Sequence, residues 1–392
     1  MFAYNSEHRA KLGSVSFLVN STRVDPIHMS RNIVICCDGT SNDVTGHPTN
    51  VLKLYRTLQK DESQLTYYSP GVGTVSDPTT KTAIGKWISR RIDLGFGLSL
   101  RENACNIYQF LVTNYRDGDK IYLFGFSRGA YTVRAVAGMI EFLGLLRPEQ
   151  AGMERHAWSI YADDDSRLSV SERFKAGRKF SSAFTIQPKP RVHFLGAWDT
   201  VSSFGWLWNL RTLPYTSNNP LVRHVRHAVA LDERRAMFQQ NLCRRNEANE
   251  TFEEVWFAGG HGDVGGGWPE NQSRLSKISF RWMLEAAVEQ GLHLERHNVK
   301  DYFRSWRRRK PPEPVKDPPP YNEALEGAWW LVECLPRRLW DPRSRRMRWT
   351  RPHLARRRRV PFGAAIHTSV GDLIDRCPAY RPDAIVAKTR PS

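Results

Sequence analysis

Two hydrophobic periodicities alternate along the first 300 residues, and this alternation restricts the possible fold more than any other feature. Short continuous apolar runs are typical of strands buried on both faces, and four stand out: 32–37, 120–125, 191–197 and 254–258. Between them, apolar residues recur at helical spacing in 50–58, 101–115, 128–143 and 275–286. Strands alternating with helices predict an α/β fold, with a mostly parallel central sheet covered by helices on both faces.

The segment Gly125-Phe126-Ser127-Arg128-Gly129 matches the pattern G-x-S-x-G. Its position strengthens the match, because it directly follows a predicted buried strand and opens a predicted helix rich in alanine and glycine. Such a strand–turn–helix is the nucleophile elbow of α/β hydrolases, in which the serine occupies a strained turn at the top of the sheet. The alternative is a tight connection without chemistry. The context favours Ser127 as a catalytic nucleophile on an α/β-hydrolase-like sheet.

A serine nucleophile needs a base and an orienting carboxylate, which follow it in chain order as Asp or Glu and then His. Asp199 comes just after the strand at 191–197, and His261 follows the strand at 254–258 and two glycines. The carboxyl ends of parallel strands gather active sites, so we predict the triad Ser127, Asp199 and His261. A turn carboxylate and a structural histidine are the alternatives. His367 also follows Asp199 and is the alternative catalytic base.

The same chemistry requires N–H donors for an oxyanion. The backbone N–H of Arg128 is the first expected donor, and the loop containing Gly39 and Thr40 is placed to supply the second. Carboxylates at 38, 43 and 263 offer an alternative as ligands of a hard cation, but no EF-hand spacing supports it. The glycine-rich stretch 261–267 matches neither a P-loop nor a dinucleotide fingerprint. We therefore predict no metal and no cofactor.

The chain carries a net charge of +18 over 392 residues, and the excess is concentrated. Residues 301–360 contain 17 Lys or Arg against seven acids, beside a proline-rich stretch at 310–320 and several tryptophans. We expect a tail at 1–29, a catalytic domain at 30–300, a basic Pro/Trp/Arg-rich lid or accessory segment at 301–360, and a C-terminal segment at 361–392 that returns to the core.

A segment this basic attracts polyanions, and its tryptophans favour an anionic membrane surface over nucleic acid. The plainer alternative is a solubilising segment. No particular protein partner is predicted. The N-terminus lacks a secretory signal, and no apolar run reaches the roughly 20 residues that span a bilayer. Six scattered cysteines suit a reducing compartment. We expect a cytoplasmic protein, with export that needs no signal peptide as an alternative.

Four segments together resemble a known family: ICCDGTSND, GFSRGAYTVRAVAGMI, FLGAWDTVSSFG and WFAGGHGDVGGGW, with IHTSV at 366–370. They are similar to the α/β hydrolases typified by the catalytic domains of bacterial type VI secretion phospholipase effectors. The resemblance implies a Ser-Asp-His hydrolase with its triad at Ser127, Asp199 and His261, and for some members ester hydrolysis on lipids. The chain departs from the family at Gly262, where serine is usual, and has no counterpart of the membrane-targeting modules of the large effectors.

The sequence therefore predicts a serine hydrolase that cleaves carboxylic esters through an acyl-enzyme, with a lipase or phospholipase activity on a lipid or other ester. Two alternatives stay open. One is an esterase or thioesterase acting on a soluble substrate. The other is a non-catalytic protein that binds polyanions or membranes on a hydrolase scaffold.

Overall fold

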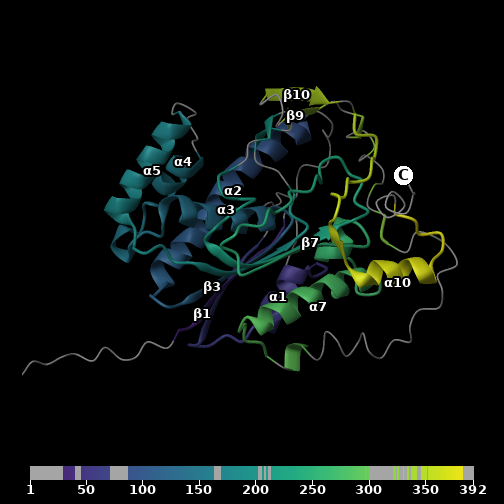
Figure 1. Cartoon of the computed structure of the whole chain (residues 1–392), viewed down its shortest axis with the longest axis horizontal. Coiled ribbons are helices and arrows are strands. Elements are labelled where there is room, and N and C mark those ends of the chain that lie inside the picture. The colour runs from purple at the N-terminus through teal and green to yellow at the C-terminus, as the bar shows by residue number, and fades with distance from the viewer. Residues whose placement is uncertain are drawn as a thin grey trace, which may run out of the picture.

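A computed structural model describes most of the chain (Figure 1). The described residues are 30–39, 46–70, 87–162, 169–201, 205–206, 209–210, 213–295, 297–299, 321–323, 325, 330, 333–334, 337–341, 346–350 and 352–382. The main strands are β1 (Asn32–Cys37), β2 (Gln64–Ser69), β3 (Lys120–Phe126), β4 (Val192–Trp198), β7 (Val222–Ala230), β8 (Thr251–Phe257) and β11 (Ala365–Ile366). Two short pairs are β5 (Gly205–Trp206) with β6 (Asn209–Leu210), and β9 (Arg337–Asp341) with β10 (Arg346–Thr350). The helices are α1 (Asn50–Thr57), α2 (Trp87–Asn114), α3 (Arg128–Leu143), η1 (Pro148–Gln150), α4 (Glu154–Ala162), α5 (Val170–Phe184), α6 (His261–Gly265), α7 (Arg274–Glu289) and α10 (Thr368–Arg376).

Seven strands form one sheet in the order β11-β8-β7-β4-β3-β1-β2, and all of its strand pairs are parallel. The chain moves from β1 outward to β2, then returns to β3 on the other side of β1 and continues toward β11. The direction of winding therefore reverses between β1 and β3. In open α/β sheets such a reversal leaves a crevice at the carboxyl ends of the strands, where ligands bind.

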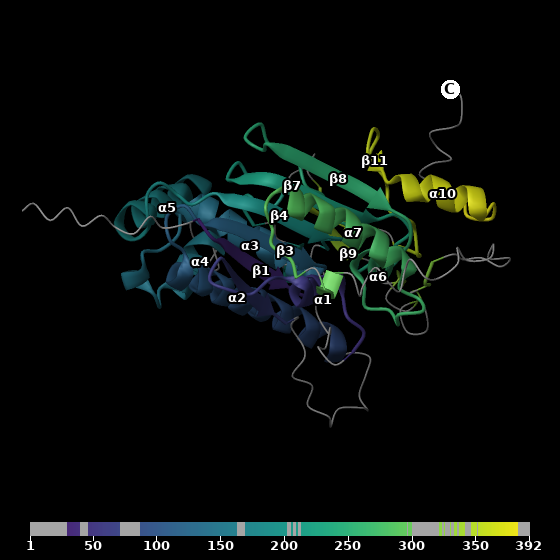
Figure 2. The same ribbon diagram turned by 90° about the horizontal axis from the view of Figure 1, so that it is seen from below.

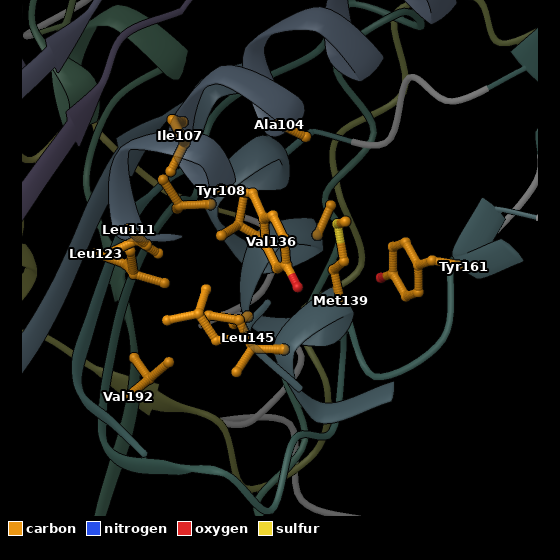
Figure 3. Close-up of a cluster of buried hydrophobic side chains, with 14 of the residues drawn as sticks. Ala104, Ile107, Tyr108, Leu111, Leu123, Val136, Met139, Leu145, Tyr161 and Val192 are labelled. Atoms are coloured by element: carbon orange, nitrogen blue, oxygen red, sulfur yellow. The ribbon is translucent and has the colours of Figure 1, made fainter. Parts of the chain in front are cut away.

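Helices cover both faces of this sheet (Figure 2). Successive residues of a strand point to opposite faces, so Ile33, Ile35 and Cys37 of β1 join one core cluster while Val34 and Cys36 join the other. The first cluster includes residues of α2, α3, α4 and α5. Figure 3 draws part of it, with labelled side chains from α2, α3 and α4 close to Leu123 of β3 and Val192 of β4. The second includes residues of α1 and α7. Burial on both faces explains the continuous apolar runs, and the predicted α/β fold with its mostly parallel sheet is confirmed.

The last strand of the sheet comes from far along the chain. Residues 365 and 366 form β11, which pairs with Val255 and Trp256 of β8. The following helix α10 contributes Val370 to a third core cluster, which also contains Val229 and Trp256. Residues of the described segment 352–382 thus pack against the same sheet as the earlier strands.

Two segments named above fall outside the described residues: the tail at 1–29 and the proline-rich stretch at 310–320. Among the helices that the structure does describe, none combines the length and the apolar character needed to cross a bilayer.

Candidate active site

Ser127 occupies the sharp turn between β3 and α3. Its φ of 58° and ψ of −122° are strained for a residue with a side chain, as in a nucleophile elbow. Although it takes the N-cap position of α3, its hydroxyl makes no capping hydrogen bond to that helix. Its backbone N–H donates to the carbonyl of Trp198 at 3.0 Å, which fixes the turn against the end of β4. The hydroxyl is therefore not used to stabilise the fold of the elbow.

Both glycines of the elbow are required by close backbone contacts. A Cβ on Gly125 would lie 2.6 Å from Ala130 of the same turn. A Cβ on Gly129 would lie 2.2 Å from the carbonyl oxygen of Cys37 and 2.4 Å from that of Asp38. The first turn of α3 therefore packs directly on the carboxyl end of β1, at the switch point of the sheet.

Asp199 and His261 form a buried pair at the same edge. Asp199 directly follows β4, has no exposed surface and adopts a φ of 37°. One of its carboxylate oxygens, Oδ2, lies 2.5 Å from Nδ1 of His261, and the other, Oδ1, accepts the N–H of Ala230 at 2.8 Å. With Nδ1 engaged in this way, Nε2 is the nitrogen of His261 that is available to act as a base.

His261 begins α6 just beyond β8 and is held on several sides. Its backbone N–H donates to Glu233 at 3.1 Å. Its imidazole lies 4.5 Å, between ring centroids, from Phe126 and 4.8 Å from Phe238. Phe126 is the residue next to Ser127, so the structure brings the three predicted triad positions to one end of the sheet. Asp199 and His261 are in direct contact, and Ser127 adjoins them through Phe126 and the carbonyl of Trp198.

The electrostatics of the pair suit a general base. Burial alone would raise the pKa of Asp199, but the positive charge of Arg358 and hydrogen bonds from His261 and Arg358 hold that pKa well below its usual range. Burial lowers the pKa of His261, and the hydrogen bond to Asp199 opposes this shift only in part. At neutral pH the pair therefore consists of a carboxylate and a neutral imidazole.

Arg358 is the residue of this site that the sequence did not reveal. Its Nη1 lies 2.5 Å from Oδ1 of Asp199 and its Nη2 lies 3.1 Å from Oδ2, with only 4% of its side chain exposed. It belongs to the basic segment at 301–360 that we expected to form a lid or accessory segment outside the catalytic domain, whereas this arginine contacts Asp199 directly. It sits in a run of four arginines, 356–359, in which nothing in the sequence distinguishes it.

Two of the expected oxyanion donors, Arg128 and Gly39, lie near the carboxyl end of β1. Arg128 is the first residue of α3, whose start packs on Cys37 and Asp38. The N–H of Gly39 donates to Oδ1 of Asp38 at 2.7 Å, so it must leave this carboxylate before it can bind an oxyanion. Thr40 lies outside the described residues. The assignment of these donors stays a prediction.

The alternative base, His367, lies at the edge of the sheet. It precedes α10, where its side chain accepts the N–H of Ser369 and so caps the helix. Its ring stacks on Phe257, with 4.6 Å between the centroids. The structure thus gives His367 a helix-capping role and places His261 against Asp199.

Two of the carboxylates considered as alternative cation ligands, Asp38 and Asp263, accept hydrogen bonds from neighbouring loops. Asp38 accepts hydrogen bonds from Thr49 and Tyr68 at 2.5 and 3.0 Å. Asp263 accepts the N–H groups of Gly260 and Asn322, and burial raises its pKa to about 6. Residue 43 is outside the described part of the chain.

Within the described residues, the side chains of His227, Cys243 and Glu254 gather closely enough to share a metal ion. Protein groups already engage all three, because Glu254 accepts from the His227 ring at 2.9 Å and from the N–H of Cys243 at 2.6 Å, and the Cys243 thiol is hydrogen-bonded to the His227 ring. The N–H of Thr200 also donates to His227 at 3.3 Å. The cluster thus forms a hydrogen-bonded support beneath the loop that follows Asp199.

Gly262 departs from the resembling family, and the structure gives a reason. A Cβ at this position would lie 2.5 Å from Nε1 of Trp268. The indole of Trp268 therefore fills the space that a serine side chain would need.

Comparisons with known proteins agree with the motifs. The model of the type VI secretion phospholipase effector Tle1-like catalytic domain matches residues 31–286. The uncharacterized protein YEL023C of Saccharomyces cerevisiae is 38% identical over 224 residues, which cover 54% of this chain and 32% of that protein. The chain thus spans about a third of the length of this relative.

Two solved structures are similar at low identity. An uncharacterized protein from Pseudomonas aeruginosa has 18% identity and a TM-score of 0.44, with coverage of 70% of this chain and 48% of that one. The Tle1 effector bound to the VgrG spike of the type 6 secretion system has 19% identity and a TM-score of 0.38, covering 63% and 52%. The family match, in contrast, extends over most of the chain, from β1 into α7. The chain therefore belongs to the family of type VI secretion phospholipase effector Tle1-like catalytic domains, as its four motifs predicted.

Proposed function

We propose that the chain is a serine hydrolase that cleaves carboxylic esters through an acyl-enzyme, with phospholipids or other lipids as substrates. The observation that carries the proposal is the buried Asp199–His261 pair beside the strained elbow of Ser127. A neutral imidazole oriented by a carboxylate, next to a serine hydroxyl that does not cap its helix, is the arrangement that activates a serine.

The reaction follows from this geometry. Nε2 of His261 accepts the proton of the Ser127 hydroxyl as its oxygen attacks the ester carbonyl carbon, and Asp199 stabilises the resulting imidazolium. Collapse of the tetrahedral intermediate breaks the bond to the alcohol, which leaves with the proton from His261. Water, deprotonated by His261, then attacks the acyl-enzyme and releases the carboxylic acid and free Ser127.

The oxyanion of each tetrahedral intermediate needs two N–H donors. The N–H of Arg128 at the start of α3 is one, and the loop at 39–40 supplies the other. The contact of Gly129 with the carbonyls of Cys37 and Asp38 supports this assignment, because it sets the beginning of α3 beside the residues that directly precede that loop.

Lipid as the substrate class is supported by the family and by exposed apolar side chains near the basic run. Trp330 and Trp349 are 48% and 62% exposed, and Phe362 is fully exposed. Aromatic side chains settle at membrane–water interfaces, and arginines pair with anionic lipid headgroups. A basic surface with exposed aromatic residues suits docking to an anionic membrane.

Labelling with a fluorophosphonate tests the proposal. The wild-type protein is expected to form one covalent adduct, which peptide mass mapping assigns to the peptide containing Ser127. Hydrolysis of anionic phospholipid vesicles should exceed hydrolysis of a monomeric short-chain ester and should weaken with salt. Reaction with the short-chain ester alone would point to a soluble-substrate esterase or thioesterase. Binding to vesicles without any adduct would leave a non-catalytic membrane binder.

The pH dependence of kcat/KM follows from the protonation state of His261. The base must be neutral to act, so kcat/KM rises with pH through the pKa of His261. Because burial lowers that pKa below its ordinary 6.5, we expect the acidic limb of the profile to have its midpoint below pH 6.5. Initial rates in a constant-ionic-strength buffer series measure this midpoint. A midpoint at or above 6.5 would contradict the assignment of His261 as a buried base.

A further inference from the structure

The buried ion pair between Asp199 and Arg358 joins the predicted triad to a segment beyond the matched catalytic region. The family match ends at residue 286, whereas Arg358 lies 159 residues from Asp199 along the chain. We propose that Arg358 is a positioning residue of the active site, which orients the carboxylate of Asp199 toward His261 and sets the pH at which the pair takes up its proton. This inference rests on the proposed function of that pair.

The geometry orients the carboxylate of Asp199. Oδ1 receives Nη1 of Arg358 and the N–H of Ala230, while Oδ2 receives Nη2 of Arg358 and the ring of His261. A guanidinium that contacts both oxygens of a carboxylate fixes the orientation of the carboxylate plane. A donor that contacts only one oxygen leaves the carboxylate free to rotate. The oxygen that contacts His261 is thus also held by the guanidinium.

The guanidinium itself is held by backbone carbonyls. Its Nε donates to the carbonyl of Phe238 at 3.1 Å, Nη1 donates to that of Ala230 at 3.1 Å, and Nη2 also donates to Phe238. Each of the three guanidinium nitrogens therefore donates to a backbone carbonyl, and Nη1 and Nη2 also contact Asp199. A buried charge is tolerated when its donors are satisfied in this way.

The backbone that carries Arg358 is fixed by a second buried carboxylate, that of Glu333. Its oxygens accept the N–H of Ala236 at 2.5 Å and the N–H of Ala355 at 3.0 Å, and contact His353 at 2.9 Å. Glu333 has no exposed surface. It thus ties the turn before Arg358 to the loop that contains Phe238, so the position of Arg358 is built into the fold.

The charge of Arg358 acts on the pair as well as its geometry. The charged groups that act on His261 are Asp199, Glu233 and Arg235, and Arg358 contacts the carboxylate of Asp199. A cation at Asp199 keeps the carboxylate ionised and reduces its attraction for a proton on His261. Without Arg358, the Asp199–His261 pair as a unit takes up its proton at a higher pH.

The test compares Arg358→Gln and Arg358→Lys with a matched control, Arg356→Gln, which removes an exposed arginine of the same run. The imidazole of His261 is titrated by NMR, with His261→Gln to assign its signal, and kcat/KM is measured over pH. Arg358→Gln should raise both midpoints by at least about half a pH unit and lower kcat/KM above pH 8 by about 10- to 100-fold. Arg358→Lys should keep the midpoints near wild type but lower kcat/KM, because it contacts only one oxygen.

The outcomes separate this inference from the proposed function. An unchanged His261 midpoint in folded Arg358→Gln would overturn it, as would the same shift in Arg356→Gln. If Arg358→Gln does not fold, Arg358→Lys with kcat/KM equal to wild type would overturn it instead. If wild type forms no fluorophosphonate adduct at Ser127 but the NMR midpoint still moves, the hydrolase assignment fails while Arg358 keeps its role in positioning the pair.

Discussion

Replacing Ser127 by alanine is expected to lower kcat on an ester substrate by roughly 10³- to 10⁶-fold while leaving the fold intact. The loss follows because no other group replaces the nucleophile, and the residual rate comes from the oxyanion donors and substrate binding. The fold should persist because the hydroxyl does not cap α3. Initial rates at saturating ester, with the thermal midpoint from circular dichroism, measure both quantities.

A matched control lies one turn along the same helix. Thr132 is buried and its hydroxyl donates to the carbonyl of Arg128 at 3.0 Å, so Thr132→Ala removes a hydroxyl without removing the nucleophile. It should keep kcat within a few-fold of wild type. Since the serine and histidine act as a unit, adding His261→Ala to Ser127→Ala should lower kcat little further. More than a tenth of wild-type activity in Ser127→Ala would exclude Ser127 as the nucleophile.

Replacing Asp199 by asparagine is expected to damage activity and stability together. The amide no longer selects the imidazole tautomer with its basic nitrogen at Nε2, a change that lowers kcat by about 10⁴-fold in a serine protease with a Ser-His-Asp triad. It also leaves the buried charge of Arg358 without its counterion, which lowers the free energy of unfolding by about 3–5 kcal/mol. Kinetics and urea unfolding measure the two effects.

Two further variants separate the effect of Asp199→Asn on kcat from its effect on stability. The ion pair of Asp119 with Arg31, 3.0 Å long, lies at the amino ends of β1 and β3, so Asp119→Asn should lower stability without changing kcat. Adding Arg358→Gln to Asp199→Asn should recover part of the lost stability, because the unpaired charge is gone, while kcat stays low. Full activity in Asp199→Asn would remove Asp199 from the triad.

The sequence predicted the helices and strands whose own apolar pattern shows which of their faces are buried. The bounds of β1 and α3 agree with expectation, and those of β3, β4 and β8 differ by one to three residues. These strands are buried on both faces, so each appears as an unbroken apolar run. The elbow and the two strand-end residues follow from the same strands, which is why Asp199 and His261 were found together.

The strand β7 was not predicted because its charges are matched only by a neighbouring strand. Arg226 pairs with Glu253 at 3.0 Å and His227 with Glu254 at 2.9 Å, all within the β7–β8 register. Read alone, the segment is too polar for a strand buried in the middle of a sheet. The edge strand β2 is only partly buried and gives a weak pattern for a different reason.

Arg358 could not be predicted from the sequence for a different reason. Four successive arginines have the same side-chain chemistry, and only the fold determines which one enters the core. The contacts of Glu333 with Ala236 and Ala355 make that choice, and both involve residues distant from Asp199 in the chain. A pattern search cannot rank such residues, because their distinguishing feature is a position in space.

The short strand β11 has a consequence for how the molecule is divided. A fragment cut where the family similarity ends would lack β11, so β8 would present its unpaired N–H and C=O groups as an open edge. The side chains of Val229 and Trp256 would lose the cover of Val370 and become exposed to water. Such a fragment is expected to associate with copies of itself through that edge, and the central sheet therefore extends well past the region by which the family is recognised.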